Sequence, residues 1–423
     1  MTISQLAKRS SSRKDPSAEY PRPAAGDSNG ASTVKKVAIF EPYVFDEAYG
    51  NLRYISGLFK YLDRTSFEPL LFAPRETEFF RKIEALGGRC ICVPAPPLLA
   101  THGGQLPRAG VWTKLAAIGS LVRYNIEISR ELKRQRVDIL ACNSIRAVMM
   151  AGWGGWLSGC PLVWYIKGDL FSPVLDRLGF CLARRILFQS AANMPARYSR
   201  LLRRYNAKVA VIENGVDLDE IAEVLRGTPS QLYHELGLSP DRVSFAYLGQ
   251  TSPHKGLMYL LEAMRLVQNQ APVALYIVGH HGAEEYRYHI DELKSFVDRQ
   301  GLRDIHFLGW RDDRLEILSL MDGFVTPSPS EGAPRSIMEA AALGKPVIAT
   351  RVGSIPAMVE DGVSGFLVEP RNAQQLAQCI LKMATDPQLR TRMGQRGFQV
   401  VRERHSFARN VTALQELYGG LAV

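Results

Sequence analysis

Short apolar runs alternate with longer amphipathic segments from residue 35 almost to the end of the chain, and this rhythm constrains the fold more than any other feature. In the first half the predicted strands are residues 37–40, 69–72, 90–93, 138–142, 162–166, 186–189 and 209–212. In the second half they are residues 243–248, 275–278, 305–308, 323–326, 347–350 and 365–368. Strands that alternate with helices form parallel sheets covered by helices on both faces. The sequence therefore predicts an α/β fold with two doubly wound, Rossmann-like parallel-sheet domains.

The length of 423 residues also favours two domains, because single hydrophobic cores stop growing at about 250 to 300 residues. A turn-forming run, Glu-Asn-Gly-Val-Asp, marks the boundary near residue 215. We expect a disordered tail at 1–33, an N-terminal domain at 34–215, a C-terminal domain at 216–403, and a helix at 404–423 that packs back on the N-terminal domain. Ligands of doubly wound sheets bind at the carboxyl ends of strands. A central cleft that the two domains face is therefore the expected site.

The net charge of +10 is unevenly distributed. Residues 1–215 contain 31 Lys and Arg against 17 Asp and Glu, a net charge of +14, and the remainder contains 21 against 25, a net charge of −4. Basic residues cluster between positions 184 and 208. Such a cluster attracts anionic lipid or a pyrophosphate-bearing acceptor, although a solvated helix face explains it equally well. Nucleic acid is not expected as a partner, because no nucleic-acid motif accompanies the charge.

The six cysteines show no CxxC spacing and indicate reduced thiols in a cytoplasmic protein. The first 33 residues lack the apolar core of a signal peptide. Residues 147–166 carry no charge, as a transmembrane span would require. Their glycines and Pro161, however, divide them into a buried helix and a buried strand, so a span is disfavoured. We expect a cytoplasmic protein with a peripheral contact to the inner face of an anionic membrane through the basic N-terminal domain.

Two acidic residues, Glu331 and Glu339, belong to the segment with the richest chemistry, and we expect Glu331 at the mouth of a helix and Glu339 two turns inside it. A turn-rich loop leads into a helix from about Pro334 to Leu343, and Gly344 ends it. The free backbone N–H groups at the start of a helix bind anions such as phosphate. Eight residues of regular helix would separate the two acids by about 12 Å, too far for a glycosidase acid and base at roughly 5 to 9.5 Å. A nucleotide sugar, with hydroxyls at both ends and a diphosphate between them, fits this layout.

A second loop, Gly249 to Leu257, follows a strong strand and precedes an amphipathic helix. Its glycines let a ligand approach the backbone, and Lys255 supplies a point charge suited to a diphosphate. It is not a Walker A loop, because the order is Lys-Gly and not Gly-Lys-Ser/Thr. A dinucleotide-dependent oxidoreductase is disfavoured too, since no GxGxxG follows the first strand.

No metal site is predicted. Asp217-Leu218-Asp219 has the DxD form that holds metal nucleotides in another fold, but its position favours a helix cap. The adjacent His280 and His281 have no Cys or carboxylate partner nearby in the sequence, so they do not suggest a metal site. Residues 279–282 are better interpreted as a loop that closes a strand and lines the cleft.

Taken in order, these motifs resemble the retaining glycosyltransferases of family four, which have the GT-B architecture. The resemblance covers nearly all of residues 34–420 and is stronger in the second half. It runs through Ile-Glu-Asn-Gly-Val-Asp (212–217), the loop 249–257, Phe-Leu-Gly-Trp (307–310), the Glu-x7-Glu element and the run from Gly-Ser-Ile-Pro (353–356) to Glu-Pro (369–370).

The resemblance implies roles for individual residues. Glu331 would contact donor-sugar hydroxyls, Glu339 would hold the ribose, and Lys255 would neutralise the diphosphate. The loop at Gly309 would border the base. In the N-terminal domain, Gly50 and Asn51 resemble the glycine loop where donor and acceptor meet. Backbone near the amino end of the helix would contact phosphate or sugar; this group is Gly332, Ala333, Pro334 and Arg335, with Gly249 and Gln250 on the facing loop.

Two positions depart from the family pattern. Arginine usually follows the glycine of the phosphate loop, whereas this chain has Gln250, so diphosphate binding should lose a charge-assisted contact worth about 1.5 to 3 kcal/mol. Arg335 or Arg351 are candidates to replace that cation. In the N-terminal domain Lys167 stands where a histidine is common, and it is a candidate either for catalysis or for an acceptor-side charge.

The implied activity is transfer of a hexosyl unit from a nucleoside-diphosphate sugar to an acceptor hydroxyl with retention, in surface polysaccharide or glycolipid assembly. The acceptor would be a glycan or a lipid-linked glycan, and no cofactor or metal is needed if Lys255 and the helix end stabilise the diphosphate. Two alternatives remain open. One is a non-hydrolysing nucleotide-sugar epimerase, and the other is a non-catalytic scaffold of the same fold that binds nucleotide sugar.

Overall fold

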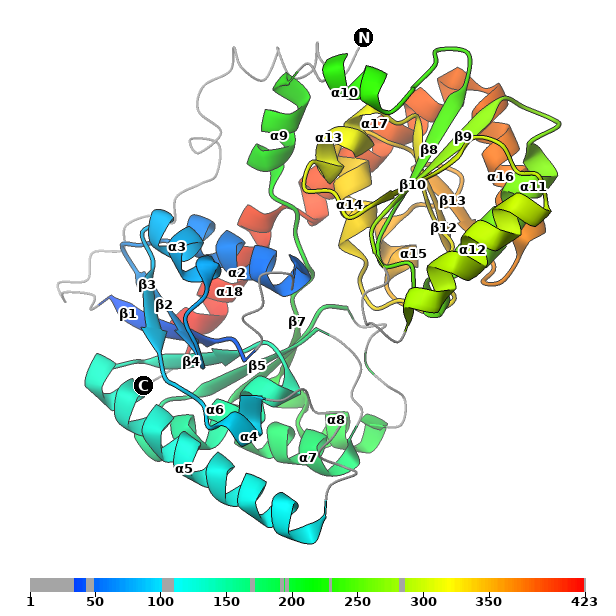
Figure 1. The fold of residues 1–423 in the computed structure, drawn as a ribbon. Helices are drawn as coiled ribbons and strands as arrows, with labels where there is room; N and C mark the ends of the chain where they lie inside the picture. Colours follow the sequence, from blue (N-terminus) through cyan, green and yellow to red (C-terminus); the bar gives the residue numbers. More distant parts are fainter. Residues whose placement is uncertain are drawn as a thin grey trace. The chain divides into compact units, whose positions relative to one another are not determined.

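A computed structural model describes residues 34–42, 49–100, 110–167, 172–190, 194, 198–227, 230–280 and 286–421. The tail predicted at 1–33 lies outside these ranges. The chain divides into two compact units, each with one parallel sheet (Figure 1). One unit runs through Glu213 and resumes at Phe407, and the other is Asn214–Ser406.

The first unit contains a seven-stranded sheet in the order β3-β2-β1-β4-β5-β6-β7, with every neighbouring pair parallel. Its strands are β1 (Lys35–Phe40), β2 (Phe67–Ala73), β3 (Arg89–Cys92), β4 (Ile139–Cys142), β5 (Leu162–Ile166), β6 (Arg185–Phe188) and β7 (Val209–Val211). All seven match predicted strands to within about three residues. Continuous apolar runs predict such strands well, because a parallel sheet between two helix layers buries both of its faces.

Two helix layers cover this sheet, and β1 shows how. Val37 and Ile39 join the core under α2, α3 and α18, while Ala38 and Phe40 join the core under α5, α6 and α7. The helices of this unit are α2 (Tyr49–Tyr61), α3 (Glu78–Ala85), α4 (Pro97–Ala100), α5 (Val111–Gln135), α6 (Ile145–Ser158), α7 (Pro173–Leu182), α8 (Ser199–Arg204) and α18 (Phe407–Gly419). The uncharged stretch 147–166 is divided between α6 and β5, as predicted.

The C-terminal helix α18 packs inside the first unit. The Phe407 ring lies 5.6 Å from the Tyr54 ring and fills the space above Gly57 of α2, where a Cβ atom would come within 2.5 Å of it. Tyr418 makes an edge contact with Phe67. The apolar spacing of residues 407–418 therefore serves burial against α2 and β2.

The second unit contains a six-stranded parallel sheet in the order β10-β9-β8-β11-β12-β13. Its strands are β8 (Val243–Leu248), β9 (Val273–Val278), β10 (Ile305–Gly309), β11 (Gly323–Thr326), β12 (Val347–Thr350) and β13 (Gly365–Val368). The strand order reverses direction between β8 and β11. In open α/β sheets such a reversal opens a crevice at the carboxyl ends of the strands, and ligands bind there.

The helices of this unit are α9 (Leu218–Arg226), α10 (Ser230–Glu235), α11 (Leu257–Val267), α12 (Arg287–Arg299), α13 (Arg314–Leu320), α14 (Arg335–Ala342), α15 (Ile355–Met358), α16 (Ala373–Thr385) and α17 (Pro387–Arg404). The unit has two hydrophobic cores. One includes buried residues of α13 and α14, and the other includes buried residues of α11 and α16. None of the helices in the described ranges has the length and apolar character that a membrane span requires.

Candidate active site

Lys255 and Glu331 form an ion pair at the point where the sheet order reverses. Lys255 ends a short 3-10 turn after β8, and Glu331 lies in the loop after β11, the neighbouring strand. The Lys255 Nζ to Glu331 Oε1 distance is 2.6 Å. The buried Ser328 hydroxyl donates to the same carboxylate oxygen at 2.8 Å. The structure thus brings together two predicted site residues that lie 76 positions apart.

This pair places a cation and an anion side by side, with the Glu331 side chain 11% exposed. An ammonium group suits diphosphate oxygens, and a carboxylate suits sugar hydroxyls. The arrangement can therefore hold an anionic group and a hydroxyl-bearing group next to each other.

The loop that carries Glu331 is fixed by close backbone packing. Gly353 has a φ of +54°, and a Cβ atom on it would lie 1.9 Å from the Glu331 carbonyl oxygen. Ser354 donates to the Gly332 carbonyl oxygen through its backbone N–H at 3.0 Å and through its hydroxyl at 2.5 Å. These contacts set the path of residues 331–332 before the chain enters α14.

Helix α14 begins at Arg335, preceded by Pro334 in extended conformation, and no side chain caps its first N–H groups. Glu331 precedes the helix by four residues, and Glu339 is its fifth residue. The sequence-based placement of Glu339 two turns inside the helix was therefore wrong, because the loop continues to Pro334 and Glu339 lies about one turn inside. The estimate of about 12 Å, which assumed regular helix throughout, does not apply.

Glu339 is almost fully buried and pairs with a residue that sequence reasoning missed. Arg314 Nη2, at the start of α13, lies 2.9 Å from Glu339 Oε1, and the two side chains are 14% and 5% exposed. The only sequence signal for Arg314 was its place in a charged run, Arg-Asp-Asp-Arg, after β10. An arginine in this position fixes the orientation of the Glu339 carboxylate.

Glycines line the carboxyl ends of three adjacent strands, at Gly249 after β8, Gly279 after β9 and Gly309 at the end of β10. The Gly279 N–H donates to the Gly309 carbonyl at 2.7 Å, and a Cβ on Gly279 would lie 1.8 Å from the Gly249 carbonyl oxygen. The strand ends thus meet backbone to backbone, without side chains between them. The sequence indicated Gly279 only as the start of a loop that lines the ligand site, and no individual role was predicted for it.

The loop after Gly249 is anchored by a hydrogen bond from Tyr247 and carries buried hydroxyl groups. The Tyr247 hydroxyl donates to the Gln250 carbonyl at 2.6 Å, and burial together with the Glu331 carboxylate raises the pKa of Tyr247. The Gln250 side chain itself is exposed. Thr251 and Ser252 are fully buried, and among the described residues their hydroxyls have no hydrogen-bond partner.

Of the two arginines that could replace the cation missing at Gln250, Arg351 is already engaged by carboxylates, whereas Arg335 lies at the amino end of α14. Arg351 pairs with Asp361 at 2.6 Å and with Glu369 at 3.5 Å. Arg335 is the first residue of α14. Beyond Gly309, the Trp310 ring makes an edge contact with His280 at 5.5 Å.

The predicted residues of the first unit lie at its own strand ends. Lys167 directly follows β5, and its Nζ lies 3.2 Å from the centroid of the Tyr54 ring, a cation–π contact. Gly50 and Asn51 belong to the first turn of α2 rather than to a loop, because α2 begins at Tyr49. The side chain of Asn51 and residues 43–48 lie outside the described part of the chain.

No cluster of metal-binding side chains occurs within the described ranges. Asp217 caps α9 by accepting from the backbone N–H groups of Asp219 and Glu220, which confirms the predicted cap.

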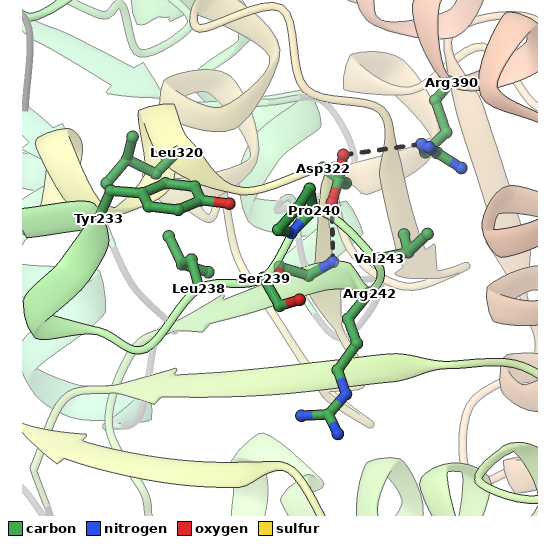
Figure 2. Close-up of a pocket in the computed structure, with 10 residues that line it drawn as sticks. Tyr233, Leu238, Ser239, Pro240, Arg242, Val243, Leu320, Asp322 and Arg390 are labelled. Atoms are coloured by element: carbon green, nitrogen blue, oxygen red, sulfur yellow. Dashed lines mark hydrogen bonds and ion pairs between the residues drawn. The ribbon is translucent and has the colours of Figure 1, made fainter. Parts of the chain in front are cut away.

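Figure 2 shows a pocket lined by Tyr233, Pro240, Arg242, Asp322 and Arg390. It lies at the amino ends of β8 and β11, where Asp322 accepts from the Ser244 N–H at 2.8 Å. Because ligands of such sheets bind at the opposite edge, this pocket is not the candidate site.

Residues 242–386 match the family model described as Glycosyl transferases group 1. A UDP-Gal:alpha-D-GlcNAc-diphosphoundecaprenol alpha-1,3-galactosyltransferase of Escherichia coli is 25% identical over 280 residues, which are 62% of this chain and 70% of that protein. A D-inositol 3-phosphate glycosyltransferase of Saccharomonospora viridis is 28% identical over 53% of this chain and 54% of its own length, so the match spans about half of that relative.

The fold extends the likeness to nearly the whole chain. The crystal structure of Anabaena HepE in complex with UDP and glucose superposes with a TM-score of 0.73 at 21% sequence identity and covers 92% of this chain and all of that one. These matches show that residues 242–386 are similar to group 1 glycosyl transferases and that the chain has the GT-B fold.

Proposed function

We propose that the protein transfers a hexosyl unit from a nucleoside-diphosphate sugar to an acceptor hydroxyl, with retention at the anomeric carbon. The observation that carries the proposal is the Lys255–Glu331 ion pair of 2.6 Å beside the amino end of α14. In this proposal residues 216–403 bind the donor and residues 34–215 bind the acceptor. The names of the E. coli galactosyltransferase and the HepE–UDP complex support a UDP-linked donor.

In the proposed complex the diphosphate takes Lys255 away from Glu331. The diphosphate carries more charge than one carboxylate, and the uncapped N–H groups of α14 attract the same anion. Glu331, still held by Ser328, then accepts hydroxyl hydrogens of the sugar. The donor thereby breaks one ion pair and forms two sets of charge-assisted hydrogen bonds.

The nucleoside would lie on the other side of the diphosphate. Glu339, oriented by Arg314, would accept from ribose hydroxyls, and the backbone at Gly309 beside Trp310 would border the base. A Cβ on Gly309 would meet nothing within 4 Å, so the backbone there is open to such an approach.

The proposed chemistry is same-face substitution. As the bond from the sugar to the diphosphate breaks, an oxygen of the leaving diphosphate accepts the proton of the attacking hydroxyl. Lys255 and the amino end of α14 stabilise the charge that develops on the diphosphate. We assign Lys167 to the sugar or the leaving phosphate, and Gly50 and Asn51 to the place where acceptor and donor meet. On this scheme the protein needs neither a metal nor a cofactor.

The proposed acceptor is a glycan on a lipid diphosphate, as in surface polysaccharide or glycolipid assembly. Two observations support this class. The E. coli relative is named for a diphosphoundecaprenol acceptor, and residues 1–215 carry a net charge of +14, from 31 Lys and Arg against 17 Asp and Glu. A cytoplasmic protein in contact with the inner face of the membrane would meet such an acceptor.

The test has two stages. A thermal-shift panel of UDP-, GDP- and ADP-sugars identifies the donor, because a ligand at 100 times its Kd stabilises the fold by about 2.7 kcal/mol. The preferred donor is then incubated with lipid-linked acceptors, and the product's anomeric configuration is assigned by NMR. Lys255→Gln should abolish the shift, while the exposed Lys294→Gln in α12 should leave it unchanged.

Each alternative has its own signature in this experiment. An epimerase would convert the donor to its isomer without acceptor. A scaffold would bind the donor and transfer nothing. A product with inverted configuration would refute the proposed retention but would not contradict the assignment of the donor site.

A further inference from the structure

One face of the first unit exposes a long apolar stripe. On α5, Val111, Trp112, Leu115, Ile118, Val122 and Ile126 are all exposed. Five of them recur at intervals of four, three, four and four residues, which places them along one side of the helix. At 1.5 Å per residue the stripe is about 22 Å long. The opposite side of α5 is buried through Tyr124, Ile128 and Leu132, so the stripe is not needed for the core.

The neighbouring helix α6 continues this surface with Trp153, Trp156 and Leu157, all exposed. The two helices touch directly, since a Cβ on Gly154 would come within 2.7 Å of the Asn125 carbonyl oxygen, and the Gly154 N–H donates to the Asn125 side chain at 2.9 Å. We refer to these nine exposed apolar residues of α5 and α6 as the α5–α6 face. Figure 1 shows both helices on the same side of the sheet.

Tryptophan is concentrated on this face. Three of the five tryptophans of the chain belong to it, and Trp112 and Trp156 are 84% and 71% exposed. An exposed indole combines a large apolar ring with a polar N–H, and tryptophan for this reason favours the boundary between lipid chains and water. Single exposed apolar residues are ordinary, but a contiguous group of this kind marks an interaction surface.

Cations extend the same stripe. Arg130 and Lys133 follow Ile126 at intervals of four and seven residues, so they continue its line along α5. Both are exposed, and neither pairs with a carboxylate among the described residues. The two glutamates of α5 are already paired, Glu127 with Arg123 and Glu131 with Arg134. The far end of the stripe therefore presents uncompensated positive charge.

The helix layer on this side of the sheet is positive beyond α5. Arg184 before β6 and Arg200 and Arg203 of α8 are exposed and have no ion pair within the described part of the chain. Helix α8 packs on the same side of the sheet as α5 and α6.

We propose that the α5–α6 face binds the surface of an anionic lipid bilayer, with its apolar side chains at the boundary between headgroups and acyl chains and Arg130 and Lys133 at the headgroups. An amphipathic helix lying in the interface gains from buried apolar area and from attraction to anionic lipid, at about 1 kcal/mol for each basic residue near the surface. Charge complementarity favours lipid over a second copy of this face, because two copies would bring like charges together. The inference deepens the proposed function, because membrane binding would give the protein access to a lipid-linked acceptor. Only this purpose rests on the proposed function, and the binding of lipid itself does not.

The experiment measures binding of the full chain to vesicles without donor or acceptor. The full chain should sediment with phosphatidylcholine vesicles containing 30% phosphatidylglycerol, about tenfold less with pure phosphatidylcholine, and progressively less as salt rises. Both Trp112→Ser/Ile118→Ser and Arg130→Glu/Lys133→Glu should weaken binding at least tenfold. The matched controls lie in the other unit, at exposed positions: Tyr288→Ser/Val363→Ser for apolar loss and Arg299→Glu/Arg303→Glu for charge reversal.

A second measurement does not depend on the folding of a variant. Brominated lipid should quench the wild-type tryptophan fluorescence, and Trp112→Phe and Trp156→Phe should each remove part of that quenching. Three outcomes overturn the proposal: no binding to anionic vesicles, binding that the α5–α6 variants leave intact, or a concentration-dependent dimer that the same variants dissociate. Donor-induced thermal shifts should be the same in all variants, so failure here is distinct from failure of the proposed transferase activity.

Discussion

Arg314 Nη2 lies 2.9 Å from Glu339 Oε1, and this ion pair links the start of α13 to the middle of α14 almost out of contact with water. A buried pair is costly to form, but removing one partner leaves the other charge buried alone. The pair therefore ties the stability of the second unit to the geometry of the proposed ribose contact.

Arg314→Ala should destabilise the second unit by about 3 to 5 kcal/mol, because it removes the arginine from the buried Glu339 carboxylate. Glu339→Gln keeps the shape and should cost less in unfolding free energy than Arg314→Ala, but it should weaken donor binding. The measurements are urea denaturation and donor Kd by calorimetry. Glu316→Ala, in the same helix, is a control. Equal losses for Arg314→Ala and Glu316→Ala would contradict the role of the pair.

Gln250→Arg should strengthen donor binding. The Gln250 backbone is fixed by the Tyr247 hydroxyl, and its side chain is exposed in the same loop that carries Lys255. An arginine there can be accommodated without disturbing the core and would add a cation to the proposed diphosphate site. A charge-assisted hydrogen bond contributes about 1.5 to 3 kcal/mol, and exposure favours the lower value, about a tenfold decrease in Kd.

The control for Gln250→Arg is Gln300→Arg, which adds the same charge at an exposed position after α12. Isothermal calorimetry at two salt concentrations measures both. If the two variants gain equally, the effect is long-range attraction, and the phosphate loop has been misassigned.

The strands could be predicted because each depends on its own sequence. A buried parallel strand such as β5 is apolar throughout, so thirteen apolar runs predicted thirteen strands. The proximity of Lys255 and Glu331 was also predictable in outline, because both follow strands of one parallel sheet and such ends share an edge.

The fine structure of the site was not predictable, because it depends on tertiary contacts. Nothing near Arg314 indicates that its partner lies 25 residues later in another helix. Gly353 was noted only as part of the run Gly-Ser-Ile-Pro, and the sequence does not show that the Glu331 carbonyl oxygen packs against it. The start of α14 was placed one residue early and Glu339 one turn too deep, since helix boundaries depend on loop contacts such as those of Ser354.

Lys345 should make stability depend on pH in the alkaline range. Burial lowers its pKa to about 8 in the folded protein, although the Asp322 carboxylate acts in the opposite direction. The unfolded chain keeps the usual pKa of about 10.4, so between pH 8 and pH 10.4 the unfolded state binds more protons and Lys345 contributes stability that rises with pH. Below pH 8 the charged, buried ammonium lowers stability.

The measurement is the difference in unfolding free energy between wild type and Lys345→Met from pH 7 to pH 10. Lys345→Met should be the more stable at pH 7, and its advantage should shrink as the pH rises. Lys294→Met, which removes an exposed ammonium, should show no such trend. A constant difference across the range would contradict the assigned pKa.

Gly353→Ala should disrupt the loop of Glu331 far more than its backbone conformation alone requires. Gly353 and Gly362 have similar positive φ values, +54° and +74°, but a Cβ at Gly353 would lie 1.9 Å from the Glu331 carbonyl oxygen, whereas nothing lies within 4 Å of a Cβ at Gly362. Gly362→Ala therefore carries only the cost of the left-handed conformation, about 1 to 2 kcal/mol, and should bind donor normally. Gly353→Ala adds a backbone collision that must move Glu331 away from Lys255, so it should be less stable to urea and should lose donor affinity. Equal stability and equal donor Kd in the two variants would show that the contact does not hold Glu331 in place.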